Sequence, residues 1–241
     1  MLTAFKQRTR RQVGLAVILA LIAGYIDSYA LLNFNVYASF MSGNTTQAGL
    51  QAGRGQLLDA AIHLLPIPLF VGGVFVGTFH LLGGRRQPVR GLCSLVSACL
   101  ATSLAITYCR PLTTLCSIIL LSFGMGVMNS MITRIGEQRI SLGFVTGDLN
   151  NIGRHLALTA RGVALPDSVA PGDTHSWRAA VLAGVWGSFF VGAMLSGAGM
   201  LLAGKWILLP PIFALLALSL FDVSPAAADH KAGRDQVSGQ E

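Results

Sequence analysis

The chain has 241 residues, of which 53% are hydrophobic and only 11% are charged. A soluble domain carries about 25% charged residues, so this chain has less than half the charge that a water-facing surface needs. The mean hydropathy of +0.62 likewise indicates a membrane protein. Lys and Arg in such a chain act first as topology signals. The composition excludes a soluble enzyme, a nucleic-acid-binding domain and a secreted disulfide scaffold.

Six apolar segments predict six membrane-spanning helices. Most of them contain the roughly 17–25 apolar residues that cross a bilayer. They cover residues 13–33, 57–83, 91–109, 112–132, 179–203 and 206–222. The sequence therefore predicts an all-α integral membrane protein whose main partner is the lipid bilayer. Residues 1–12 form a basic N-terminus before an uncleaved first helix, and residues 223–241 form a disordered tail.

The Lys and Arg residues predict the orientation of the helices. With the N-terminus in the cytoplasm and six crossings, 14 of the 17 basic residues lie inside, and the other three are Arg54, Arg110 and Lys205. Eight crossings, with residues 40–54 and 144–160 added, would leave 10 inside and 6 outside. Because basic residues favour the cytoplasmic side, we expect six crossings with both termini in the cytoplasm.

The two halves of the chain repeat one pattern. Residues 24–28 match 126–130, residues 40–44 match 144–148, and residues 70–72 match 190–192, in the same order. Each half, 13–110 and 111–222, holds three crossings, so the halves must be inverted relative to each other. Inverted repeats are common in transporters, which bind substrate at the repeat interface near the membrane midplane. Duplication without a transport role is the alternative.

Small residues recur every four positions in the first and fourth helices. They are Ala16, Ala20, Gly24 and Ser28 in one helix and Ser122, Gly126 and Ser130 in the other. Small residues at this spacing let helix backbones approach closely in a membrane. We therefore expect the first and fourth helices to pack together at the pseudo-symmetric centre.

A polar motif after the first helix of each half is the main candidate site. Its residues are Ser42, Gly43, Asn44 and Thr45 in the first half and Thr146, Gly147, Asp148 and Asn150 in the second. Asn44 and Asp148 are predicted helix N-caps, with Gln47 as the capping-box partner of Asn44. A helix from Asn44 to Gly53 would rise about 15 Å, which suits a re-entrant half-helix. Two surface loops with ordinary caps are the alternative.

Asp27 is the deepest charged residue of the predicted spans, and Asn129 is its counterpart in the second half. An intramembrane acid predicts proton relay or ion binding. A structural acid that is hydrogen bonded to the motif loops is an equal alternative. In the same half we expect His63 to be packed and hydrogen bonded, and Pro66 to kink the second span.

Patterns for catalysis and metal binding are missing from the sequence. It contains no Gly-x-Ser-x-Gly, Walker or His-Glu-x-x-His pattern, and its four cysteines lack the close spacing of metal ligands. We therefore expect no catalytic residue, no metal and no cofactor. Cys109 and Cys116 flank a predicted outer turn and could pair in an oxidising periplasm.

Three stretches resemble the YoaK-like family of small bacterial multi-pass membrane proteins of unknown function. They are Gly-Tyr-Ile-Asp at 24–27, Phe-Met-Ser-Gly-Asn-Thr at 40–45 and Val-Thr-Gly at 145–147. Ser42 stands where the family has threonine, and Met128 stands where it has glutamine before asparagine, so no role of that glutamine carries over. The resemblance covers residues 13–222. It implies the fold and a bacterial inner-membrane location, without a substrate.

Two classes of function follow from these features. The first is a transporter or channel for a small polar solute or ion, with the two motif half-helices pointing their N-termini at one shared site. The second is a non-transporting assembly or regulatory protein in which the motifs only lock the halves together. An enzyme and a nucleic-acid partner are not expected, and a homo-oligomer is compatible with both classes.

Overall fold

The computed structural model describes residues 2–83, 87–106, 113–131, 134–135, 138–139, 145–166, 168 and 172–220. Its helices are α1 (Leu2–Phe34), α2 (Met41–Gly53), α3 (Leu57–Leu64), α4 (Pro66–Leu82), α5 (Pro88–Ile106), α6 (Thr113–Ser130), α7 (Val145–Ala160), α8 (His175–Ala203), the 3-10 helix η1 (Gly204–Leu208) and α9 (Leu209–Leu220). Two short strands, β1 (Arg134–Ile135) and β2 (Gln138–Arg139), pair antiparallel. The predicted all-α class is confirmed, with this ladder as a minor addition.

The apolar helices coincide with the predicted spans. Four stretches are long and apolar enough to cross a bilayer, namely Arg10–Phe34, Leu57–Leu82, Pro88–Ile106 and His175–Ala203. Two shorter apolar helices are Thr114–Ser130 and Trp206–Leu220. Large apolar side chains such as Leu58 and Phe79 are 84% and 71% exposed, as lipid-facing side chains would be. The chain is therefore a multi-pass membrane protein.

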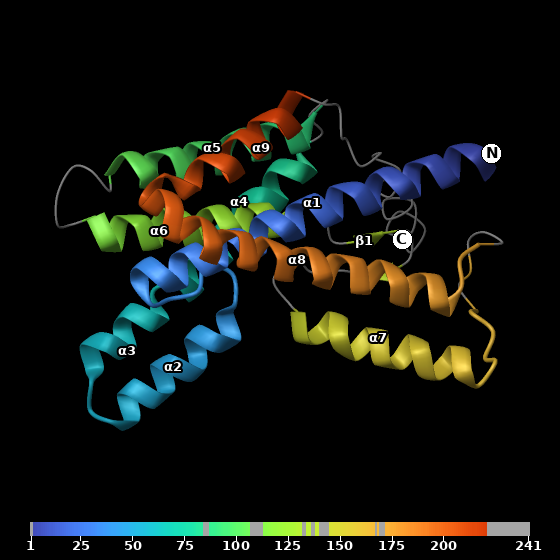
Figure 1. Ribbon diagram of the computed structural model, residues 1–241, viewed down its shortest axis with the longest axis horizontal. Helices are drawn as coiled ribbons and strands as arrows, with labels where there is room; N and C mark the ends of the chain where they lie inside the picture. The colour runs from blue at the N-terminus through green and yellow to red at the C-terminus, as the bar shows by residue number, and fades with distance from the viewer. Residues whose placement is uncertain are drawn as a thin grey trace, which may run out of the picture.

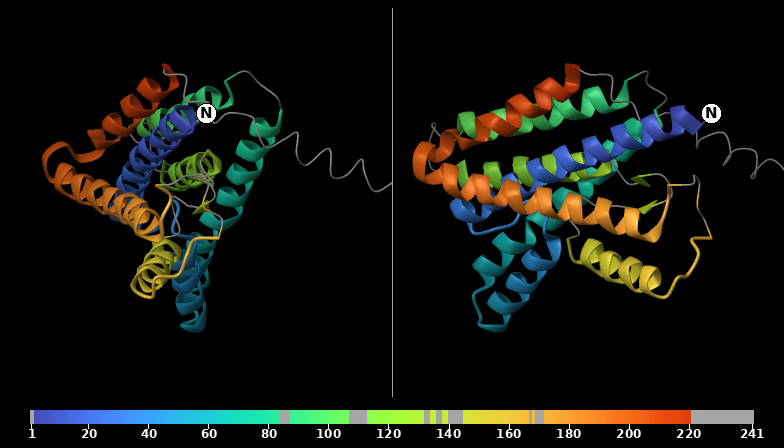
Figure 2. Two further views of the ribbon diagram at one scale, coloured as in Figure 1. Left: turned by 90° about the vertical axis from the view of Figure 1, so that its right-hand side faces the viewer. Right: turned by 45° about the vertical axis from the view of Figure 1, so that its right-hand side comes forward.

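Two pairs of helices form the centre of the molecule (Figure 1). α1 packs along α8, and these two helices are parallel to each other. α4 packs along α6, and these two are also parallel to each other but antiparallel to α1 and α8. α5 packs against α6 and α9 on one side of the bundle. α7 and the α2–α3 hairpin lie on the other side, as both views of Figure 2 also show.

The small residues of α1 and α6 do make close contacts, but with partners other than those predicted. α1 and α6 touch each other only briefly, because the glycine face of α1 meets α8 and that of α6 meets α4. Spacing in the sequence indicates which face of a helix carries small residues, but it does not indicate which helix packs against that face.

The second span is broken at a proline, as predicted. α3 ends at Leu64 and α4 begins at Pro66, whose nitrogen has no hydrogen to donate to the preceding turn. His63 is buried, as expected, but its Nδ1 has no hydrogen-bond partner among the described residues. The expectation that His63 is hydrogen bonded is therefore wrong for Nδ1.

Several predicted features lie outside the described residues. They are the tail over 223–241, Cys109 as a disulfide partner, Phe144 of the second motif and Arg110 of the outer turn. Cys116 itself is a free thiol.

Candidate functional site

Both motif helices begin three residues earlier than predicted. α2 begins at Met41, and Phe40, which precedes it, makes no side-chain cap. Asn44 is therefore the fourth residue of the helix, and Asp148 is likewise the fourth residue of α7, which begins at Val145. The assignment of Asn44 and Asp148 as N-caps is wrong. The predicted end of the first motif helix, Gly53, is confirmed.

The Asn44 side chain folds back onto the loop before α2. Its Oδ1 accepts the Tyr37 backbone N–H at 2.9 Å, and its Nδ2 donates to the Tyr37 carbonyl at 2.7 Å. The side chain is completely buried. The amide therefore closes the 37–44 loop, and its position as the fourth residue of α2 excludes it as the N-cap.

Asp27 holds the same loop from α1. One carboxylate oxygen accepts the backbone N–H of Ser39 and the other accepts its hydroxyl, both at 2.6 Å. Asp27 precedes the end of α1 at Phe34 by seven residues, which is about 10 Å along a helix. The contact therefore draws the loop back beside α1, about two turns before the end of that helix, and α2 then runs outward along α3.

Gly43 makes room for an aromatic pair at the start of α2. The rings of Tyr37 and Phe40 meet edge to face, with centroids 5.2 Å apart. A Cβ on Gly43 would collide with the Phe40 ring and lie 3.0 Å from the Tyr37 ring. The neighbouring Ser42 and Thr45 are exposed, and the Thr45 hydroxyl donates to the Met41 carbonyl at 2.8 Å.

The second motif lies on α7, which packs along α8. Asp148 is buried and Gly147 is half-buried, whereas Thr146 and Asn150 are exposed. Asn129, the counterpart of Asp27, is half-buried near the end of α6. This pattern of burial is the same as in the first motif, in which the fourth residue of the helix is buried and its polar neighbours are exposed.

The N-terminal ends of α2 and α7 face each other on one side of the bundle, and the two helices run apart toward opposite ends (Figures 1 and 2). The starts of the two motifs therefore lie on the same side of the bundle, and α2 and α7, both within the described residues, make no extended contact with each other. A surface hollow of 420 Å³ at Gly55–Asp59 lies at the far end of α2. An apolar groove of 320 Å³ between α5 and α9 lies on the other side of the bundle.

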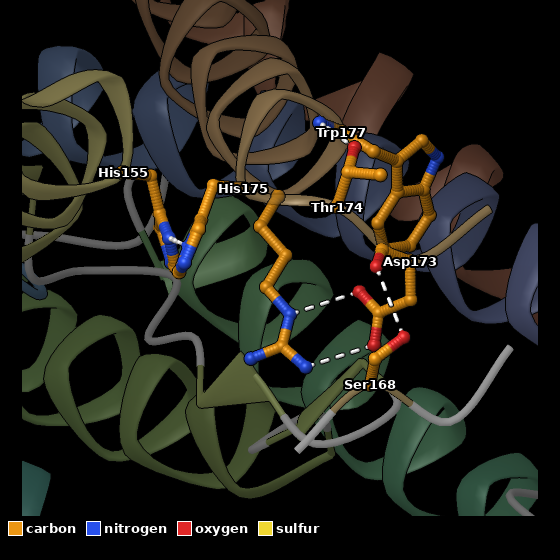
Figure 3. Close-up of polar contacts among 7 residues, drawn as sticks. His155, Ser168, Asp173, Thr174, His175 and Trp177 are labelled. Carbon is orange, nitrogen blue, oxygen red and sulfur yellow. Dashed lines mark hydrogen bonds and ion pairs between the residues drawn. The ribbon is translucent and has the colours of Figure 1, made fainter. Parts of the chain in front are cut away.

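A polar cluster where α7 meets α8 was not predicted (Figure 3). The Nδ1 atoms of His155 and His175 are 2.8 Å apart, so one ring donates and the other accepts. Arg178, 5% exposed, donates to both oxygens of Asp173 at 2.9 and 2.8 Å. His155 lies 20 residues before His175. Among the members at the start of α8, only Thr174, whose hydroxyl accepts the Trp177 N–H, carries a recognisable N-cap signal.

The described residues include no group of three or more His, Cys, Asp or Glu side chains that could hold a metal ion. The His155–His175 contact is a hydrogen bond that joins α7 to α8.

Residues 15–221 match the family described as protein of unknown function DUF1275. The chain belongs to this family. The UPF0700 transmembrane protein RA0705 of Rhizobium meliloti (strain 1021) is 30% identical over 215 residues, which are 88% of each chain. No solved structure matches. The resemblance to a bacterial membrane family of unknown function is confirmed, and membership of DUF1275 brings no substrate or activity with it.

Proposed function

We propose that this DUF1275 protein is a transporter or channel for a small polar solute or ion in the bacterial inner membrane. The proposal includes six crossings, arranged as two inverted three-helix repeats, with both termini in the cytoplasm.

The observation that carries the proposal is a set of equivalent glycine contacts. A Cβ on Gly24 of α1 would collide with the carbonyl of Phe189 on α8. A Cβ on Gly126 of α6 would collide with the carbonyl of Phe70 on α4. Each contact joins the first helix of one half to the second long helix of the other half.

The reverse contacts have the same register. A Cβ on Gly192 would collide with the carbonyl of Leu21, and one on Gly73 with the carbonyl of Phe123. Leu21 and Phe123 each precede the glycine of their own helix by three residues. Two halves related by an inverted repeat would produce this reciprocity. The contacts also correct the match between residues 70–72 and 190–192 by one position, because Gly73 rather than Gly72 is the equivalent of Gly192.

The helix directions support six crossings. α1 and α8 run in the same direction, so the number of crossings between them must be odd. α4 and α5 supply two, and α6, although shorter, supplies the third. α9 then returns the chain toward the side where α1 begins.

The motif helices support a shared polar site. In an inverted repeat α2 enters from one membrane face and α7 from the other, as re-entrant half-helices. Their facing N-termini offer backbone N–H groups and a partial positive charge, while buried Asp148 opposes an anion. We propose a polar solute there, with Ser42, Thr45, Thr146 and Asn150 as open polar groups and Asp27 as the proton- or ion-responsive group.

The second candidate is the non-transporting assembly or regulatory protein. The hydrogen bonds of Asp27 and Asn44 favour it, because they go to the loop next to α2, as in a structural lock.

Uptake into proteoliposomes, with and without a proton gradient, tests the proposal. The wild type is expected to accumulate a polar solute, and Asn44→Leu to abolish uptake by opening the 37–44 loop. Gln47→Leu, on the exposed surface of the same helix, is the matched control and retains uptake. Asp27→Asn changes the pH dependence. Absence of uptake by a stable wild-type protein across ions, amino acids and sugars would favour the second candidate.

A further inference from the structure

We propose that the α1–α8 pair and the α4–α6 pair are two rigid bodies that move relative to each other, and that α2 and α7 are the connectors that transmit this movement. The inference rests on the proposed function for its biological role, and the arrangement of helices carries it.

Within each pair the backbones themselves are in contact. A Cβ on Gly73 would lie 3.0 Å from the Cα of Gly126, and a Cβ on Gly126 would lie 3.0 Å from the Cα of Gly73. In the other pair, a Cβ on Gly192 would lie 3.0 Å from the backbone nitrogen of Tyr25. Close-packed backbones without intervening side chains resist sliding, so each pair moves as one body.

Between the pairs the direct contact is much smaller. α1 crosses α6 over a short length, whereas it follows α8 over a long one. The chain passes from one pair to the other through α2, which leads from α1 to α3 and α4, and through α7, which leads from α6 to α8. A third passage, from α8 through η1 to α9, brings the chain to α5.

The backbone outside the pairs has the turns that such connectors need. Positive φ angles in the described part occur at Asn35, Gly55, Gly162 and Gly204. Asn35 and Gly55 flank α2, Gly162 follows α7, and Gly204 is the first residue of η1, directly after α8. Hinges commonly lie at the ends of elements, where a few residues absorb the change in φ and ψ.

A relative rotation of the two bodies would therefore tilt α2 relative to α7, which stays packed along α8, and the N-terminal ends of the two helices face each other. Because α2 runs toward one end of the bundle and α7 toward the other, such a tilt would open the shared polar site to one membrane face while it closes the other. This deepens the proposed function by assigning the moving parts.

Distances between spin-label pairs in lipid bilayers test the inference. Ile18 and Leu201 report on the α1–α8 pair, Leu82 and Leu115 on the α4–α6 pair, and Leu82 with Leu201 on the distance between the pairs. All four side chains are exposed, so labels leave the packing intact. Within each pair we expect a narrow distribution of label-to-label distances. Between the pairs we expect a distance distribution that has two maxima or is roughly twice as wide as those within the pairs.

Three equally narrow distributions would overturn the inference, as would a within-pair distribution as wide as the between-pair one. The measurement does not depend on a known substrate. If the pairs move and no solute is taken up, the proposed function fails and the inference stands. If solute is taken up and all three distributions are narrow, the proposed function stands and the inference fails.

Discussion

Asp27 and Asn44 share a mode of attachment, because both bond to the short loop between α1 and α2. A capping motif in the sequence joins residues that are three or four positions apart. The Asn44 amide instead bonds to Tyr37, seven residues earlier. This is why the sequence predicted the polar residues and the end of α2 but not their roles. The loop also supplies Ser39, which binds Asp27 and which no motif indicated.

The first prediction concerns Ser39. Ser39→Ala removes a hydroxyl that donates to the Asp27 carboxyl at 2.6 Å inside the bundle, and should lower the free energy of unfolding by about 1–3 kcal/mol. Thr45→Val is the matched control, since its exposed hydroxyl bonds only within α2, and should change it by less than about 0.5 kcal/mol. Thermal unfolding in detergent measures both. Equal effects would contradict the Asp27 contact.

A second prediction concerns Arg178. Arg178→Met leaves the Asp173 carboxylate without its bidentate partner, and both side chains are largely buried, at 6% and 11% exposed. Loss of one member of a buried pair should cost about 3–5 kcal/mol. Arg154→Met, at an exposed position on α7, is the control and should have little effect. A double variant with Asp173→Asn should recover part of the loss; no recovery would refute the coupling.

Among the helices, glycines decide which elements approach each other closely. α1 and α6 were predicted to be tightly packed, and they are, although against α8 and α4. The prediction depended on spacing alone, and the identity of the partner depends on a contact between residues far apart in the chain, such as Gly24 and Phe189. The break at Pro66, by contrast, follows from one residue's covalent structure and was predictable.

A third prediction compares two Gly→Ala substitutions that should change the stability of the protein in opposite directions. Gly24→Ala places a methyl group against the Phe189 carbonyl, and should destabilise the protein by about 1–3 kcal/mol. Gly184→Ala, on the exposed surface of α8 with no atom within 4 Å, should stabilise it by about 0.5–1 kcal/mol. Unfolding midpoints of the two variants give the comparison. A stabilising Gly24→Ala would show that α1 and α8 do not touch there.

For the whole molecule, hydropathy was enough to predict the class and the apolar segments, whereas the orientation inferred from the Lys and Arg distribution stays a prediction. The arrangement of the helices was less accessible. The repeats in the sequence predicted two related halves, but they did not indicate that each half packs its first helix against the other half. The His155–His175 pair was missed because the two rings meet only after α7 folds onto α8, and no motif indicated the local Arg178–Asp173 pair.

A fourth prediction tests the orientation. Arg54→Cys, at the exposed α2–α3 turn, and Arg161→Cys, exposed just after α7, are placed in a chain whose four native cysteines are serines. An impermeant maleimide should label position 54 in intact cells and position 161 only after lysis, because basic residues concentrate on the cytoplasmic side. Labelling of position 161 in intact cells would reverse the proposed topology.

The exchange of partners between the halves also governs how the protein is made. α1 is inserted first, yet the helix that packs on its glycine face, α8, begins at His175. Until α8 has been synthesised, α1 must remain in the bilayer with Gly24 uncovered, and α6 completes its pair with α4 much sooner. Contacts between distant parts of a chain form late in folding. Of the two central pairs, the α1–α8 pair therefore assembles second, and a chain that stops before His175 contains an α4–α6 unit and a first helix without its partner.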